Sequence, residues 1–474
     1  MPVGRPTNVL LVTLDTTRPD HLGCYGGRAK TPQLDRLCAE GVRFDAAFTP
    51  IPSTFPSHAA LMTGRYPQSV GVHDNAVYFM PAEPATLAET LRERGYATGA
   101  FVSAFVLDKQ FRLDQGFEVY DDRVDRPLMA NDLSKIPAGM DPARKKWEAT
   151  IATAYQRRGD ATVKAAGEWL GGLGARPFFL WVHLFDAHQP YQPPPPHERD
   201  YDPDYRGAMD GDQRPFFAAR RKGTLQPGDF DHMVALYDGE LSWLDDCVGQ
   251  LLDAVSGVGR MDETLVVVVG DHGEGLEEHH QVFEHNSELY DEAVHVPLIV
   301  RRPGAAAHGE KVAALVRTID LAPTISEWLG LPADGGAQGR SLLGFTEADA
   351  AKRAAAESPD DGDGAGSGEI LLEALRARQI NPVAESLIGL RDKKWKVIVA
   401  LGADDEPKRV ELYDLEADPG EKHDLSRERA EIAMKLRDKA LGLYRQLPKP
   451  AGDNARELNA IDNDAVKQLG YGRR

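Results

Sequence analysis

Near its N-terminus the chain reads VLLVTLDT from Val9 to Thr16, a nearly continuous apolar run that ends at an aspartate. A strand with one exposed face alternates apolar and polar residues, whereas a strand buried on both faces does not. The run therefore predicts a buried strand of a mainly parallel sheet flanked by helices. Open sheets of this kind bind ligands at the carboxyl ends of their strands, so we expect Asp15 beside a functional site.

Three more runs share this apolar, β-branched character, at Phe178–Val182, Leu265–Val269 and Val296–Val300. The stretches between such runs are long enough to hold helices, which is the pattern of an α/β fold with a helix-covered parallel sheet. Helices are expected at Thr31–Glu40, Ala85–Arg94, Ala161–Leu170, Ala235–Val255 and Leu321–Leu329.

With 474 residues the chain is long enough for more than one domain. We expect a catalytic domain over 1–349, a flexible linker or loop over 350–369 and a small C-terminal domain over 370–474. In the last of these, an antiparallel sheet followed by a helix is predicted. Its strands are expected at Ser386–Leu390, Trp395–Val399 and Arg409–Asp414, and its helix from about Ser426 to Leu447.

The net charge of −19 argues against a nucleic-acid backbone or an anionic membrane as a partner. No apolar run approaches the length of a membrane span, and no export signal precedes the first strand. The cysteines Cys24, Cys38 and Cys247 show no C-x-x-C spacing, which predicts a reducing compartment and no disulfide framework. We therefore expect a cytoplasmic protein. The sequence indicates no oligomeric state.

Carboxylate and imidazole side chains follow three of the predicted strands. Asp15 follows the first, Asp186 and His188 the second, and Asp271 and His272 the third. An isolated Asp-His pair at a strand end is as often a hydrogen-bonding pair, but three such endings meet at one edge of the sheet. This donor set suits divalent metals, with zinc or manganese favoured over calcium or magnesium. Bound metal would also supply the local positive charge that a small anionic substrate needs.

A second segment with chemical character reads IPSTFPSHAALMTG from Ile51 to Gly64. A helix is predicted from Pro56 or Ser57 to Met62, with Gly64 at its end. Thr54 would then lie just ahead of the helix, where unpaired backbone N–H groups favour an anion. The alternative is that Thr54 or Ser53 only caps the helix.

These motifs together resemble the sulfatase family of the alkaline phosphatase superfamily. The resemblance covers nearly the whole chain and implies the alkaline phosphatase-like α/β fold with a small C-terminal domain. It rests on Leu14–Gly26, Thr31–Asp35, Thr54–Gly64, Gly270–Glu274, Leu289–Ala293, Thr318–Thr324 and Glu411–Leu415.

Two departures from the sulfatase pattern change the implied chemistry, one in the nucleophile motif and one at Thr16, which stands where many sulfatases have another metal-binding carboxylate. Sulfatases begin a C/S-x-P-x-R motif with a residue that becomes formylglycine, whereas the matching residues here are Thr54, Pro56 and His58. Threonine cannot form that aldehyde. The segment, with Asn75 downstream, is instead similar to nucleotide pyrophosphatase/phosphodiesterases. This likeness implies that Thr54 is the nucleophile and a metal ligand and that Asn75 contacts the phosphoryl group. His58 is either a substrate contact or a structural histidine at the helix start.

The same likeness implies a second metal, held by Asp186, His188 and His285. His285 stands near the position of a sulfatase lysine that contacts the sulfate. The rival ligands, His279 and His280, are interpreted as part of a solvated loop. Two divalent metal ions are therefore expected, the first of them bound by Asp15, Asp271 and His272.

The predicted function is a metal-dependent hydrolase of phosphate esters, with phosphodiesters or phosphonate monoesters favoured, that works through a covalent phospho-threonine. One alternative is a sulfate-ester hydrolase without formylglycine. Another is a phosphoethanolamine-type or phosphoglycerol-type transferase, and the non-enzymatic alternative is a metal-binding pseudoenzyme.

Overall fold

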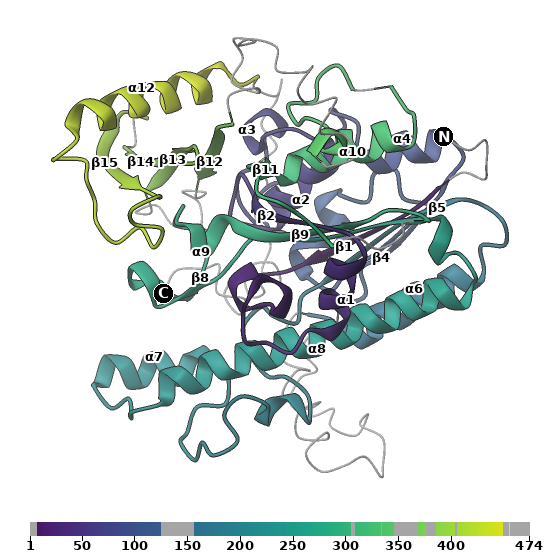
Figure 1. The fold of residues 1–474 in the computed structure, drawn as a ribbon, viewed down its shortest axis with the longest axis horizontal. Coiled ribbons are helices and arrows are strands. Elements are labelled where there is room, and N and C mark those ends of the chain that lie inside the picture. The colour runs from purple at the N-terminus through teal and green to yellow at the C-terminus, as the bar shows by residue number, and fades with distance from the viewer. Residues whose placement is uncertain are drawn as a thin grey trace.

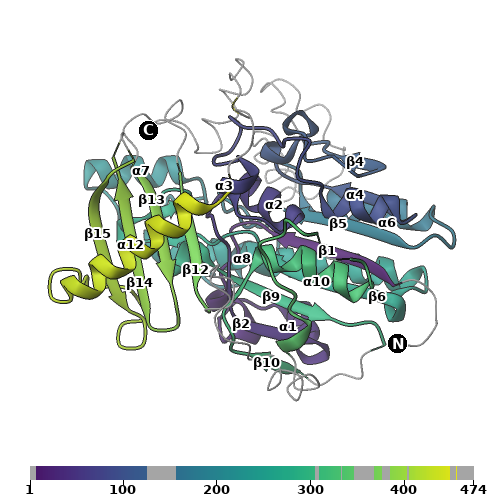
Figure 2. The same cartoon turned by 90° about the horizontal axis from the view of Figure 1, so that it is seen from above.

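The computed structural model describes residues 7–124, 156–304, 309–332, 334–345, 368–375, 385–402, 405–448 and 455. A large helix-flanked sheet stands beside a smaller sheet made by the C-terminal part of the chain (Figures 1 and 2). All but the last two residues of the predicted linker 350–369 lie outside the described residues. Within the described part, no helix is both long enough and apolar enough to cross a membrane.

The first strand, β1 (Asn8–Leu14), lies at the centre of the large sheet. It pairs in parallel with β5 (Phe178–Leu184) on one side and β6 (Thr264–Gly270) on the other, so all three carboxyl ends meet at one edge. The strand order is β10-β2-β9-β6-β1-β5-β3-β4, and β11 also pairs with β2. The remaining bounds are β2 (Val42–Phe48), β3 (Ala97–Phe101), β4 (Val119–Asp121), β9 (His295–Arg301), β10 (Glu310–Val312) and β11 (Val316–Arg317).

Strand β9 corrects the expectation of parallel strands at Val296–Val300, because it runs antiparallel to both β2 and β6. The chain that leaves β6 stays at the carboxyl edge of the sheet, where it forms a small hairpin and the short helix α9 (Asp291–Val294). Without a crossover to the opposite edge, the next strand must run back. Burial on both faces produces the same apolar run in either direction.

Helices cover both faces of the large sheet (Figure 1). Leu10 and Val12 of β1 enter the core formed with α1, α6 and α8, whereas Val9 and Leu11 enter the core formed with α2, α4 and α10. This two-sided burial explains the continuous apolar run. The helices are α1 (Pro32–Glu40), α6 (Gly159–Gly171) and α8 (Asp229–Gly257) on one face, and α2 (Thr54–Thr63), α4 (Leu87–Glu93) and α10 (Leu321–Trp328) on the other.

The predicted C-terminal antiparallel sheet is confirmed, with one strand more than expected. Helix α12 (Ala430–Gln446) packs against one of its faces through Ala433, Ala440 and Leu441. The other face packs against the main body around Phe48 and Leu289. The strands are β12 (Ile370–Ala374), β13 (Ser386–Arg391), β14 (Trp395–Leu401) and β15 (Pro407–Asp414).

Polar contacts also join the C-terminal sheet to the main body. The backbone N–H of Glu373 in β12 donates to the Pro50 carbonyl at 2.8 Å, just ahead of α2. The fully buried ammonium of Lys396 lies 2.9 Å from Asp291 Oδ1 and 2.8 Å from Glu421 Oε1. Because Asp291 opens α9, this buried ion pair connects β14 to the segment that enters β9.

Cys24 and Cys38 form a disulfide, which corrects the expectation of unpaired cysteines. The short helix η2 (Gly23–Tyr25) turns the chain back onto α1, so the two Cα atoms lie 6.5 Å apart although 14 positions separate them. Cys247 is a buried free thiol. The cysteine argument for a reducing compartment therefore does not hold.

Shorter elements complete the described chain. They are α3 (Pro67–Val70), α7 (Gln213–Lys222), β7 (Gly275–Leu276), β8 (Val282–Glu284), η1 (Pro19–His21), η3 (Phe105–Leu107), η4 (Lys109–Phe111), η6 (His197–Arg199), η7 (Met261–Glu263), η8 (Glu278–His280), η9 (Thr318–Asp320) and η10 (Leu343–Phe345).

Candidate active site

Four predicted site residues meet in the interior at the carboxyl edge of the sheet. Asp15 follows β1, Asp271 and His272 follow β6, and Thr54 is the first residue of α2. All four are fully buried. One potential ligand atom from each of Asp15, Asp271 and His272 lies within 4.8 Å of the others. Thr54 Oγ1 is 3.2 Å from His272 Nε2, so the predicted nucleophile and the predicted first metal site are adjacent.

The protein fixes the tautomer and the orientation of His272. Its Nδ1 donates to the Gly273 carbonyl at 3.0 Å, which leaves the lone pair on Nε2, the nitrogen that faces Thr54. Gly273 is required next to it, because a Cβ at this position would lie 2.0 Å from the Glu292 carbonyl oxygen. The Nε2 of His272 is therefore presented to the cluster as a metal ligand or as an acceptor for the Thr54 hydroxyl.

The carboxylates of the cluster are suited to a cation. Asp15 Oδ1 and Asp271 Oδ2 are buried and accept no hydrogen bond from the described residues. Burial raises the pKa of Asp15 to about 8, and burial together with the nearby Asp15 raises the pKa of Asp271 well above its usual value. Burial lowers the pKa of His272 well below its usual value. Two adjacent carboxylates and a neutral imidazole thus fit a divalent metal, which would compensate the buried negative charge.

His183 belongs to this cluster, although it was absent from the predicted set. Its Nε2 lies 3.2 Å from Asp15 Oδ2, and burial lowers the pKa of the imidazole to about 3. His183 therefore holds the carboxylate of Asp15 from the side. The signal was present in the sequence, because His183 is the one polar residue in the otherwise apolar strand Phe178–Leu184.

His58 braces the backbone beneath Thr54. Its Nδ1 donates to the Thr54 carbonyl at 2.7 Å, and its Nε2 accepts from the Thr13 hydroxyl at 2.9 Å, which in turn accepts from Trp181. His58, His183 and Asp271 form a second group with metal-ligand spacing. Since both ring nitrogens of His58 are engaged within the protein, Asp15, Asp271 and His272 make the better ligand set.

The helix that carries Thr54 begins two residues earlier than expected. Ser53 is the N-cap residue of α2, Thr54 is its first helical residue, and Gly64 ends it with a left-handed φ of 64°. In the first turn of α2, Phe55 donates its N–H to Asn75 and Pro56 has none, which leaves the Thr54 N–H to face an anionic group at the helix N-terminus.

Asn75 is oriented by that helix. Its Oδ1 accepts from the Phe55 N–H at 2.8 Å, whereas its buried Nδ2 meets no acceptor among the described residues. Because Phe55 follows Thr54 in the chain, Asn75 is bonded to the backbone next to the candidate nucleophile, and its amide N–H groups remain able to donate.

Only part of the predicted second metal site comes together. The His285 ring lies 4.4 Å from the His272 ring and 5.1 Å from the His188 ring, measured between centroids. Asp186 points elsewhere, because its Oδ1 accepts from the Gly159 N–H and from Trp243 Nε1, both at 3.0 Å. The side chain of Asp186 therefore points toward helices α6 and α8. The position of Asp186 in the sequence, just after a strand, did not reveal this direction.

Glu274 is the carboxylate that does lie beside His285, and the predicted set did not include it. It is fully buried, and its Oε1 is 3.2 Å from His285 Nδ1. The Tyr191 hydroxyl donates to its other oxygen at 3.1 Å. Its place in the motif Gly270–Glu274 was the available signal.

Strained backbone surrounds the cluster. Left-handed φ angles are rare outside glycine and cost free energy, so they persist where the surrounding structure imposes them. Four such residues lie within two positions of Asp15, Asn75 or His285. They are Thr16 (φ 46°), Ala76 (φ 66°), Phe283 (φ 53°) and Asn286 (φ 76°).

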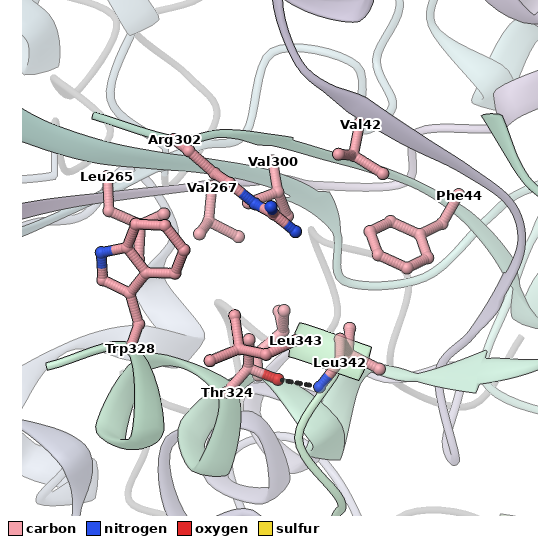
Figure 3. Close-up of a pocket in the computed structure, with 11 residues that line it drawn as sticks. Val42, Phe44, Leu265, Val267, Val300, Arg302, Thr324, Trp328, Leu342 and Leu343 are labelled. Atoms are coloured by element: carbon pink, nitrogen blue, oxygen red, sulfur yellow. Dashed lines mark hydrogen bonds between the residues drawn. The ribbon is translucent and has the colours of Figure 1, made fainter. Parts of the chain in front are cut away.

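A small cavity lies away from this cluster, between α10 and the sheet (Figure 3). Its volume is about 20 Å³, and its lining is mainly apolar, including Phe44, Val267 and Trp328. A space of this size holds at most about one water molecule. Arg302 and Thr324 are its polar lining residues, and none of the cluster residues lines it.

Comparison with known proteins identifies one family. The family model described as sulfatase matches residues 7–331. The multifunctional alkaline phosphatase superfamily protein PehA of Trinickia caryophylli is 28 % identical over 406 residues, which cover 71 % of this chain and 76 % of that protein.

Two solved structures share the fold. The phosphonate monoester hydrolase of Agrobacterium radiobacter is 24 % identical, with a TM-score of 0.69 and coverage of 93 % of this chain and 96 % of that one. BT4656, solved with its substrate D-glucosamine-2-N,6-O-disulfate, is 20 % identical, with a TM-score of 0.70 and coverage of 94 % and 100 %. The predicted alkaline phosphatase-like α/β fold is thereby confirmed, and the relative's ligand is a small anionic ester.

Proposed function

Because this chain belongs to the sulfatase family of the alkaline phosphatase superfamily and is an ester hydrolase of that superfamily, we propose that it hydrolyses phosphate esters through a covalent phospho-threonine. Phosphodiesters or phosphonate monoesters are the favoured substrates and Thr54 is the nucleophile. The observation that carries the proposal is the 3.2 Å approach of Thr54 Oγ1 to His272 Nε2, beside two buried carboxylate oxygens that lack a hydrogen-bond donor among the described residues.

We propose one divalent metal, zinc or manganese, held by Asp15, Asp271 and His272 with the Thr54 hydroxyl. When bound, it would lower the pKa of that hydroxyl so that a threonine oxygen is nucleophilic near neutral pH. A second metal receives less support, because Asp186 binds α6 and α8 rather than joining His188 and His285.

The chain's own residues would then position the reacting group. The Thr54 backbone N–H and the Nδ2 of Asn75 donate to the non-bridging phosphoryl oxygens and stabilise their charge as the ionised Thr54 oxygen attacks phosphorus. The bond from phosphorus to the leaving oxygen breaks, and its electron pair stays with that oxygen. Water then attacks phosphorus from the vacated side and releases Thr54.

The choice of phosphorus over sulfur follows from the nucleophile. Threonine forms a covalent ester, which water must hydrolyse by attacking the phosphorus or sulfur atom of that ester. The formylglycine aldehyde of the sulfatase pattern is absent here. Names of relatives support the same choice, since one is a phosphonate monoester hydrolase and another a multifunctional superfamily protein. The second candidate is a sulfate-ester hydrolase with the same residues, which the sulfatase family match favours.

The deciding experiment compares bis-aryl phosphate, aryl phosphonate, aryl phosphate and aryl sulfate as substrates of zinc- or manganese-loaded protein. Wild type, Thr54→Ala and Thr54→Ser are measured, with Thr63→Ala as a control on the same helix, because the Thr63 hydroxyl bonds the Ala59 and Ala60 carbonyls of its own helix. We expect the phosphodiester or the phosphonate to be cleaved fastest, the alanine variant at position 54 to be inactive and the serine variant to retain part of the rate. Preferential sulfate cleavage would favour the second candidate, and full activity of Thr54→Ala would refute the nucleophile.

A further inference from the structure

The C-terminal sheet lies against helices α2 and α3, which precede Asn75 in the chain (Figures 1 and 2). Leu371 of β12 belongs to the same apolar cluster as Ala60 of α2. On α12, the Tyr444 hydroxyl donates to Gln68 Oε1 of α3 at 2.9 Å. The C-terminal part of the chain therefore contacts both the helix of the candidate nucleophile and the helix that leads to Asn75.

Glu373 of β12 makes two polar contacts with this region. Its backbone N–H donates to the Pro50 carbonyl at 2.8 Å, four residues ahead of Thr54. Its Oε1 accepts from His73 Nδ1 at 3.2 Å, two residues ahead of Asn75. The side chain of Glu373 is 3 % exposed and that of His73 is 18 % exposed, so water competes little with the hydrogen bond between them.

The two segments that Glu373 contacts meet again beside the candidate nucleophile. There, the Asn75 side-chain oxygen accepts from the Phe55 N–H at 2.8 Å. Segments 50–55 and 73–75 are thus joined at both ends, by Glu373 at one end and by Asn75 at the other. The Glu373 carboxylate closes this ring of contacts from the C-terminal sheet.

We propose that Glu373 is a positioning residue, which fixes the Asn75 amide relative to Thr54 by holding His73. The inference rests on the proposed function, in which Asn75 donates to a phosphoryl oxygen. Ala76, directly after Asn75, has a left-handed φ of 66°, a conformation that persists where surrounding contacts impose it. An amide donor is effective when it is held where charge develops, so a contact that restrains its segment contributes to the rate.

The test is a double-mutant cycle on zinc- or manganese-loaded protein, with whichever of the aryl phosphodiester and the aryl phosphonate wild type cleaves faster. Glu373→Ala keeps the backbone bond to Pro50. It should lower kcat about tenfold and change KM little, because Asn75 acts on charge that develops in the transition state. Glu373→Gln still offers an oxygen to His73 and should stay within about threefold of wild type. In an Asn75→Ala background, Glu373→Ala should change kcat less than about twofold, because the group that it positions has been removed.

Glu411→Ala is the matched control. Glu411 is another buried carboxylate of the C-terminal sheet, and it accepts from the Tyr290 hydroxyl of the main body at 2.8 Å. Its loss should lower the unfolding temperature but leave kcat within about twofold of wild type, since it does not contact segment 73–75. An equal loss of kcat in Glu411→Ala and Glu373→Ala, or an equal effect of Glu373→Ala with and without Asn75, would overturn the inference. If Glu373→Ala fails to fold, His73→Ala removes the other end of the same hydrogen bond and carries the same comparison.

Hydrogen exchange tests the geometry without turnover. The Phe55 N–H should exchange about threefold or more faster in Glu373→Ala than in Glu411→Ala, because its acceptor Asn75 is held less firmly. Equal exchange at Phe55 in these two variants would overturn the positioning role. Absence of ester cleavage by wild type would refute the proposed function, whereas exchange at Phe55 would still show whether Glu373 fixes Asn75.

Discussion

The side-chain oxygen of Asn75 accepts a hydrogen bond from the backbone N–H of Phe55 at 2.8 Å, across 20 positions of sequence. The bond leaves the amide nitrogen as the only part of Asn75 able to donate to a substrate. Asn75→Asp keeps the acceptor for Phe55 and replaces the donor by a negatively charged oxygen. We expect kcat/KM to fall by about a hundredfold or more, as for other preorganised oxyanion donors.

The matched measurement for this variant is thermal unfolding. Asn75→Asp should remain folded at the assay temperature, although the added buried carboxylate lowers its unfolding temperature, and Asn75→Leu, which leaves Phe55 N–H without its acceptor, should be less stable than wild type by about 1–3 kcal/mol. An Asn75→Asp variant with wild-type kinetics would remove Asn75 from the catalytic arrangement.

Metal binding should be visible as stability. Asp15 and Asp271 place two carboxylates together in the interior, so zinc or manganese added to metal-free protein should raise the unfolding temperature. At a metal concentration 100 times Kd the gain is about 2.7 kcal/mol. Asp15→Asn and Asp271→Asn should lose this gain, and their metal-free forms should be more stable than metal-free wild type, because folding no longer has to bury a carboxyl group against its tendency to ionise.

Asp186→Asn provides the control for that experiment, since Asp186 binds the Gly159 N–H and Trp243 instead of the cluster. It should retain the full metal-induced rise. If metal raised the unfolding temperature of Asp186→Asn less than that of wild type, Asp186 would be a metal ligand after all.

The fold was more predictable than the site, for reasons visible in particular residues. Burial on two faces shows directly in composition, so β1, β5, β6 and most helices followed from apolar runs. The direction of β9 did not, because Val296–Val300 has the same composition whichever way it runs.

Within the site, residues at strand ends were predictable and side-chain directions were not. The proximity of Asp15, Asp271 and His272 was predictable, because neighbouring parallel strands end at the same edge of the sheet. Asp186 also follows a parallel strand, yet its carboxylate accepts a hydrogen bond from the Gly159 N–H and so points toward helix α6. His183, a polar residue in an apolar strand, and Glu274, part of the Gly270–Glu274 motif, could be singled out in the sequence, but the residues that they contact lie in other segments, and one sequence does not show which segments meet.

A pH dependence of stability is expected from His279. Its Nδ1 is 2.6 Å from Glu292 Oε1 and its Nε2 is 2.7 Å from the Glu421 carbonyl, so both nitrogens must carry hydrogen to satisfy both acceptors. Burial opposes the charge, but Glu292 outweighs it and raises the pKa of His279. Since the folded pKa exceeds the unfolded value of about 6.5, this stabilisation is complete below pH 6.5 and is lost as the pH rises through the folded pKa.

The check is the unfolding temperature of wild type minus that of His279→Gln between pH 5 and 9. The difference should shrink as the pH rises through that window. His423→Gln, a substitution of an exposed histidine, is the control for loss of an imidazole. A constant difference for His279→Gln would show that its charge plays no part.

The disulfide predicts a thiol count. Cys24 and Cys38 are paired and Cys247 is free, so unfolding without reductant should expose one reactive thiol per chain, and unfolding after reduction three. Titration with a thiol reagent measures both values. Three reactive thiols before reduction would show that Cys24 and Cys38 are unpaired, as the cysteine spacing predicts.

The ammonium of Lys396, fully buried in β14, is neutralised by Glu421 of its own C-terminal part and by Asp291, which begins α9 in the main body. A chimera that received the C-terminal sheet alone from a relative would keep the partner equivalent to Glu421 but meet a foreign α9, and removing one partner of a buried ion pair is strongly destabilising. An exchange of the C-terminal sheet would therefore have to carry α9 with it.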